Sequence, residues 1–284
     1  MEVNKHYYGE RGLINCLIDW FAKKPTGNKV IRFLSEIIYA DSKKLVINEE
    51  IKKADIYNEF SFGEFGDPDL IIRIETENEK NTTEEKPKVY IFIIEAKTDT
   101  FEKSREKQEY DDTKKQVLLQ YKGHASDIDI QLLLRRRFIF ALNKCKGEFK
   151  SIEAEEKKYK KVRDKKVGEG YTYKDINVRA LKKEKLIEWA KNNLKEEENK
   201  DYIYKYIAIT NDNSVDNVNY LYQHYINMDN CQQPDDVDKD STLIDCKDFG
   251  MITWKMIIKK FKIRGMSQTC RRTFEANNPY PSNK

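Results

Sequence analysis

Two short apolar runs that carry acids near their ends constrain this chain more than any other feature. The first covers residues 66–72 and contains Asp69, and the second covers residues 89–97 and contains Glu95. Short apolar runs bounded by polar segments predict strands that are buried on both faces. Burying an ionised carboxylate costs several kcal/mol unless it is paired or coordinates a metal, so acids at the ends of such strands require a cation nearby.

The spacing of the two acids predicts that they meet. If the polar segment 76–88 is a hairpin loop, its midpoint is Thr82, and reflection about Thr82 places Asp69 opposite Glu95. Opposed residues of an antiparallel pair have Cβ atoms ~4.5–5.5 Å apart. Lys97 follows Glu95 by two positions, and this spacing places both side chains on one face of a strand. Two carboxylates and one ammonium are therefore expected to converge on one point.

This combination of groups suits a magnesium site that acts on a phosphate. Asp69 and Glu95 supply the hard oxygen ligands that Mg²⁺ prefers and leave coordination positions for water and a phosphate oxygen. Lys97 is placed to orient an attacking water or to offset charge on the phosphate. The competing interpretation, a surface hairpin with an ordinary Glu and Lys at its ends, does not explain the two buried runs.

At these residues the sequence resembles the PD-(D/E)XK nuclease superfamily, since Pro68-Asp69 and Glu95-Ala96-Lys97 match its motif as written. The resemblance implies an α/β, restriction-endonuclease-like fold, in which a mixed central sheet is flanked by helices, here with a helical insertion. It implies Mg²⁺-dependent phosphodiester hydrolysis, with Mn²⁺ able to substitute. It also implies a metal held by Asp69, Glu95 and the Ala96 carbonyl, with Lys97 near the nucleophilic water.

Two helices are expected before the catalytic strands, over residues 11–22 and over residues 29–40, because apolar residues recur there at helical spacing. In the superfamily one such helix often contributes a Glu to the metal site. Glu10, at the start of the first helix, and Glu36, on the second, are the candidates. Glu10 is preferred because residues 10–13 lead into the helix as the family's Glu often does.

A helix is also expected after the second catalytic strand. Many superfamily members carry a Gln there, and Gln116 and Gln120 are similar in position. The two residues are four apart and share a helix face, so either can reach the site. The choice between them stays open, as does the alternative that each is an ordinary solvent-facing Gln.

The remaining pattern predicts one domain with an insertion. Further strands are expected over residues 54–62, 138–142 and 202–210, and an amphipathic helix over residues 181–194. The chain then divides into four parts: a nuclease core over 1–145, a charged helical insertion over 146–200, a C-terminal strand and helices over 201–275 that complete the same domain, and a loose tail over 276–284.

Two basic segments are candidates for contact with a nucleic-acid backbone. Three consecutive arginines, Arg135, Arg136 and Arg137, stand at the start of the strand expected over 138–142. A C-terminal helix capped by Thr253 lies in a segment, 251–274, with seven basic residues and no acid. Its candidates for phosphate contact are Lys259, Lys260, Lys262 and Arg264. A solvated basic helix is the alternative interpretation of this segment.

Composition limits the setting in which such a chain would act. The chain has 284 residues and a net charge of +4, and no apolar run approaches the ~18 residues needed to span a bilayer. No membrane association and a cytoplasmic location are therefore expected. The function predicted best is a DNA endonuclease in restriction, phage defence or repair. A module that binds nucleic acid or protein without cutting, and a nuclease acting on RNA, remain alternatives, and a homodimer or partner subunits remain open.

Overall fold

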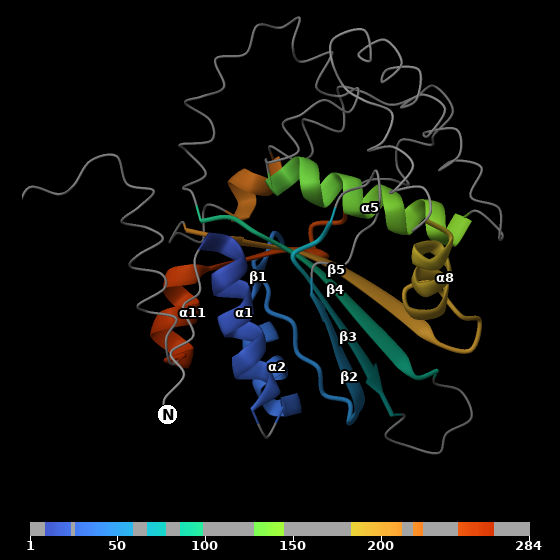
Figure 1. Ribbon diagram of the computed structural model, residues 1–284, viewed down its shortest axis with the longest axis horizontal. Coiled ribbons are helices and arrows are strands. Elements are labelled where there is room, and N and C mark those ends of the chain that lie inside the picture. The colour runs from blue at the N-terminus through green and yellow to red at the C-terminus, as the bar shows by residue number, and fades with distance from the viewer. Residues whose placement is uncertain are drawn as a thin grey trace, which may run out of the picture.

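A mixed six-stranded sheet forms the centre of the protein (Figure 1). The computed structural model describes residues 9–23, 26–58, 67–77, 86–98, 128–144, 183–211, 218–223 and 244–263. The strands are β1 Ile38–Tyr39, β2 Ile51–Asn58, β3 Leu70–Thr76, β4 Lys88–Ala96, β5 Asp201–Thr210 and β6 Phe249–Thr253. Their order across the sheet is β1-β6-β5-β4-β3-β2, and only the β4/β5 and β5/β6 pairs are parallel.

Helices cover both faces of this sheet, as Figure 1 shows. One face is covered by α1 (Gly9–Ala22), α2 (Thr26–Leu34) and α11 (Trp254–Phe261), and the other by α5 (Ile128–Lys144) and α8 (Lys183–Asn193). Burying both faces of a sheet requires strands that are apolar on both sides, and β4 is buried at every position after its first. The expectation of an α/β protein with a mixed sheet flanked by helices is confirmed.

The pairing of β3 with β4 has the predicted register. Leu70 pairs with Ile94 and Glu75 pairs with Val89, in an antiparallel ladder without a shift. Each pair is symmetric about position 82, so continuing the ladder by one step places Asp69 opposite Glu95. The two short apolar runs thus form the hairpin that reflection about Thr82 predicts.

Other predicted elements are confirmed as well. The helices at residues 11–22 and 181–194 correspond to α1 and α8, and the strand at 202–210 corresponds to β5. Thr253 caps α11 as expected, because its side-chain oxygen accepts a hydrogen bond from the Met256 backbone N–H. None of the described helices is long and apolar enough to cross a membrane.

The strand predicted over 138–142 is wrong, because these residues belong to the long helix α5. The apolar run Phe138–Leu142 is too short to distinguish a strand from a buried helical segment by itself. Among the α5 side chains that the structure describes, the buried ones recur at helical spacing. They are Ile128, Leu132, Arg135, Phe138, Ile139 and Leu142. An arginine interrupts this otherwise apolar stripe, which obscures the helical pattern in the sequence.

The helix predicted over 29–40 extends too far. Helix α2 ends at Leu34, and Ile38 and Tyr39 form the short strand β1, which pairs with β6. The strand predicted over 54–62 begins earlier, at Ile51, and residues 59–62 lie outside the described residues.

Neither β1 nor β6 is apparent in the sequence. Gly250 in β6 explains part of the difficulty, since a Cβ at this position would lie 2.6 Å from Ile37 Cγ2 and 2.9 Å from Ile207 Cδ1. A glycine usually weakens a strand, yet here it permits neighbouring side chains to cross the backbone of β6.

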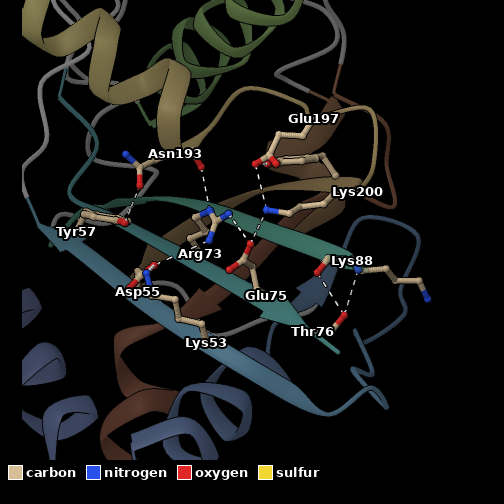
Figure 2. Close-up of polar contacts among 11 residues, drawn as sticks. Lys53, Asp55, Tyr57, Arg73, Glu75, Thr76, Lys88, Asn193, Glu197 and Lys200 are labelled. Carbon is tan, nitrogen blue, oxygen red and sulfur yellow. Dashed lines mark hydrogen bonds and ion pairs between the residues drawn. The ribbon is translucent and has the colours of Figure 1, made fainter. Parts of the chain in front are cut away.

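A cluster of charged residues attaches α8 to the sheet (Figure 2). The Arg73 Nε donates a hydrogen bond of 3.0 Å to the Asn193 backbone carbonyl oxygen. The Arg73 Nη2 lies 3.0 Å from Glu75 Oε1. Lys200 Nζ approaches the same Glu75 oxygen at 2.9 Å. Arg73 is buried, so these partners compensate for removing its charge from water.

Candidate active site

The predicted catalytic residues lie where β3 begins and β4 ends. Asp69 immediately precedes β3, and its Oδ2 accepts a hydrogen bond of 2.7 Å from the backbone N–H of Ala96. This bond fixes the Asp69 carboxylate against the last residue of β4, beside Glu95. The Asp69 side chain is only partly buried, so the carboxylate can be reached from solvent.

Glu95 lies on the face of β4 that packs under α5. Its neighbours at alternate positions, Ile91 and Ile93, belong to the apolar cluster formed with α5 and α8. Glu95 Oε1 lies 2.6 Å from Arg135 Nε, and each of the two side chains is 1% exposed. An ion pair buried to this degree joins the centre of the sheet to α5.

Two opposed influences act on the ionised form of Glu95. Burial raises the pKa of the Glu95 carboxyl above its ordinary value, whereas the adjacent Arg135 guanidinium lowers it. The negative charge of Asp69 raises this pKa further, whereas the positive charge of Lys97 lowers it. The two carboxylates and the two cations therefore form one electrostatic unit, in which any added positive charge would favour ionised Glu95.

Lys97 directly follows β4, and both polar groups of its backbone are bonded. Its N–H donates to the Ile209 carbonyl oxygen at 2.8 Å, which extends the β4/β5 ladder by one residue. Its carbonyl oxygen accepts a hydrogen bond of 3.0 Å from Trp254 Nε1 in α11. The Lys97 side chain is partly exposed, and its positive charge acts on Glu95.

The donors in this site fit a magnesium ion. Mg²⁺ is usually bound through one or two carboxylates together with water and substrate oxygens. Asp69 and Glu95 provide two carboxylates at opposed positions, and the charge of Asp69 raises the pKa of Glu95. No group of three or more His, Cys, Asp or Glu side chains arranged to hold a metal occurs in the described part of the chain. The Ala96 carbonyl as a further ligand stays a prediction.

Comparison with known proteins adds no relative. No family model matches the sequence, no curated protein is similar to it, and no solved structure matches the fold. The interpretation of this site therefore rests on its own residues and geometry.

The other predicted metal and catalytic residues are placed less directly. Gln116 and Gln120 lie outside the described residues. Glu10 lies in the first turn of α1, a helix on the face of the sheet opposite to α5, and its side chain is outside the described set. Glu36 forms ion pairs with Lys44 at 2.9 Å and with Lys260, so its charge is compensated away from Asp69 and Glu95.

The predicted nucleic-acid contacts divide into two groups. Arg135 is buried against Glu95 and presents almost no surface to a phosphate, Arg136 is partly buried, and the Arg137 side chain is outside the described residues. On α11, Lys259 and Lys260 are exposed, as is Lys262 just after the helix, whereas Arg264 is outside the described residues. Of the predicted set, the lysines are accessible and Arg135 is not.

Two features of α5 are not predicted from the sequence, namely the role of Arg135 as the partner of Glu95 and the presence of Gln131 near the site. Arg135 partners Glu95, and its presence among Leu132, Ile139 and Leu142 on one helical face is a signal that the sequence contains. Gln131 precedes Arg135 by one turn, and its buried Oε1 has no hydrogen-bond partner within the part of the chain that the structure describes. A buried amide oxygen of this kind usually bonds to water or to another donor.

Proposed function

We propose that the protein is a metal-dependent phosphodiesterase of the PD-(D/E)XK type, an endonuclease acting on DNA. The observation that carries the proposal is the hydrogen bond between Asp69 and the Ala96 N–H, in a hairpin whose register brings Asp69 opposite Glu95. Two acids held together at the ends of buried strands repel each other, and a shared cation would offset this repulsion, so a role in binding a cation accounts for their juxtaposition.

In this proposal each motif residue has a distinct task. Asp69 and Glu95 hold the Mg²⁺ ion, which polarises the scissile phosphate and lowers the pKa of a bound water. Lys97 orients that water and offsets charge on the phosphate, from a backbone held by Ile209 and Trp254. The exposed lysines of α11 contact the nucleic-acid backbone, because α11 begins beside Lys97.

A nuclease assay on the purified full-length chain tests this function. Double-stranded DNA, single-stranded DNA and RNA are each incubated with Mg²⁺, Mn²⁺ or EDTA, and cleavage of DNA is expected with either metal but not with EDTA. Glu95→Gln and Lys97→Met should each lower the cleavage rate about a hundredfold or more, because each removes a charge that acts on the phosphate or its cation.

Matched variants show whether any loss is specific to the site. Glu188→Gln and Lys52→Met make the same chemical changes at exposed positions on α8 and β2 and should cleave like the unmodified chain. Cleavage by Glu95→Gln at the unmodified rate in Mg²⁺ would show that this site assignment is wrong. Preferential cleavage of RNA would be consistent with the same active site but would show that the substrate is RNA and not DNA.

A second candidate function is a module on a nuclease-like fold that binds nucleic acid or protein without cutting. One observation favours it, namely that Arg135 already compensates the charge of Glu95 within the protein. Binding of nucleic acid at equal affinity in Mg²⁺ and EDTA, without cleavage in either, would support this candidate over the enzyme.

A further inference from the structure

The pair formed by Arg135 and Glu95 is unusual because it joins two fully buried charges at the predicted metal ligand. The atoms Nε and Oε1 are 2.6 Å apart, and both side chains are 1% exposed. Arg135 reaches this position from the apolar stripe of α5, where its neighbours on the same face are Leu132, Phe138 and Ile139. An arginine in such a stripe loses its hydration and is tolerated only if a partner compensates for the loss.

The charges around Glu95 also limit how a metal can bind there. Asp69 and Glu95 supply two negative charges, and Arg135 and Lys97 supply two positive charges that act on Glu95. A divalent cation bound to Glu95 would share one carboxylate with the Arg135 guanidinium. Two positive charges that share one carboxylate in a poorly hydrated site repel each other strongly.

The bonded atoms indicate how the carboxylate is held. Arg135 engages Oε1, so Oε2 is the oxygen through which Glu95 can bind a cation without first breaking the pair. A hydrogen-bonded carboxylate keeps its orientation, which is the usual role of the outer partners of metal ligands. Arg135 thus has opposed effects on a metal, since it orients the ligand and favours its ionised form but also adds a competing positive charge.

We propose that Arg135 is a positioning residue that serves as the counter-ion of Glu95 and weakens metal binding at this site. A higher metal concentration is then needed to fill the site than would be needed without the charge of Arg135. This inference rests on the proposed function, because it takes Asp69 and Glu95 as the cation ligands. The charge effect outweighs the orienting effect, because the repulsion acts over several ångström, whereas the packed strand β4 already limits the movement of Glu95.

Binding of Mn²⁺ to the full-length chain, measured from the electron paramagnetic resonance signal of free Mn²⁺, tests this inference. Arg135→Gln removes the charge and keeps a hydrogen-bond donor. We expect it to bind Mn²⁺ about tenfold more tightly than the unmodified chain. Its Tm should be lower in EDTA and should rise more on adding Mn²⁺, because the ion then compensates the buried carboxylate.

Three further variants complete the design. Arg135→Lys keeps the positive charge and should retain the weaker affinity of the unmodified chain. Glu95→Gln and the double variant Glu95→Gln/Arg135→Gln should both lose the Mn²⁺-dependent rise in Tm, which shows that the gain in affinity acts through Glu95. If Arg135→Gln does not fold, Arg135→Met provides the neutral comparison, and the double variant shows whether removing both charges restores the Tm in EDTA.

The outcomes separate this inference from the proposed function. Equal or weaker Mn²⁺ binding by a folded Arg135→Gln variant, in a chain that binds Mn²⁺ and cleaves DNA, overturns the inference and leaves the function intact. Tighter binding by Arg135→Gln that depends on Glu95, in a chain that cleaves no substrate, supports the inference and contradicts the function. Absence of Mn²⁺ binding by every variant contradicts both.

Discussion

Glu95 has surroundings that a carboxylate does not prefer. It lies at the end of a strand that is buried on both faces, and its charge is compensated by the Arg135 guanidinium, whose Nε lies 2.6 Å from Glu95 Oε1. Asp69 is held differently, by a backbone N–H at a partly exposed position. Two acids with opposed positions and unequal burial are a common arrangement in sites where one ligand is fixed and the other responds to charge.

A second acid, Glu75, shows the opposite effect of its surroundings. Its hydrogen bond with Arg73 lowers the pKa of the Glu75 carboxyl to about 2, and Lys200 acts in the same direction (Figure 2). The folded protein therefore binds fewer protons at Glu75 than the unfolded chain does between about pH 2 and the ordinary glutamate value. Stability from this group is complete above that ordinary value and is lost as the pH falls through about 2.

Replacing Glu75 with Gln tests this linkage. At pH 7 we expect Glu75→Gln to lower the free energy of unfolding by about 2 kcal/mol, since a hydrogen-bonded ionic contact is lost. At pH 3 the difference should be much smaller, because the unmodified glutamate then loses part of its charge on unfolding. Urea unfolding at both pH values measures the difference, and Glu77→Gln, at an exposed neighbouring position, should change little at either. A deficit that is equal at pH 3 and pH 7 would contradict the linkage.

At the scale of elements, Gly250 lets β6 pack closely against its neighbours. The positions around Gly250 are already filled by the side chains of Ile37 and Ile207, and Tyr39 Cε1 would lie 3.1 Å from an added Cβ. These three residues come from the segment after α2, from β5 and from β1. The contact therefore ties the edge of the sheet to its centre.

Enlarging Gly250 should separate these elements. We expect Gly250→Val to lower the free energy of unfolding by about 1–3 kcal/mol, because the packed core must shift to admit the side chain. Gly250→Ala should have a smaller effect of the same sign, and adding Ile37→Ala to it should cost less than the sum of the two single changes. Thermal unfolding of the unmodified chain, Gly250→Ala, Ile37→Ala and the double variant measures this coupling. Strict additivity would show that Ile37 does not limit the space at Gly250.

At the scale of the whole molecule, α11 begins beside Lys97 of the candidate site and packs on the face of the sheet opposite to α5. Trp254 begins α11 and bonds to the Lys97 carbonyl, and exposed lysines follow toward the end of the helix. Lys260 is partly neutralised by Glu36, so Lys259 and Lys262 are the better positions for contact with phosphates. A nucleic acid bound at the site would extend along this helix.

The salt dependence of binding tests this arrangement. In EDTA, which prevents cleavage, the double variant Lys259→Gln/Lys262→Gln should bind duplex DNA more weakly at every sequence. The negative slope of log K against log salt concentration should become less steep by about 2, because each of the two lost phosphate contacts contributes about 1. Fluorescence anisotropy measures both quantities. The control variant Lys43→Gln/Lys52→Gln, at exposed positions outside α11, should leave the slope unchanged. An unchanged slope in the α11 variant would show that these lysines do not contact DNA phosphates.

Sequence and structure agree most closely where the pattern is local. The register of β3 with β4 follows from two apolar runs and the polar loop between them, because a shift by one residue would turn every side chain to the other face. The Thr253 cap and the apolar stripe of α11 follow in the same way from neighbours in the chain. These features place Asp69 beside Glu95 without knowledge of the rest of the fold.

The partners of these residues were decided only by the tertiary structure. Residues 138–142 of α5 are predicted as a strand because Arg135 breaks the apolar stripe of the helix, and burial of that arginine depends on Glu95, which is 40 residues distant in the chain. Likewise, β6 contains a glycine that is favourable only because Ile37 and Ile207 pack over it. The sequence by itself determined the hairpin that brings Asp69 and Glu95 together, since its pattern is local, whereas the counter-ion of Glu95 and the edge of the sheet depend on contacts between distant segments.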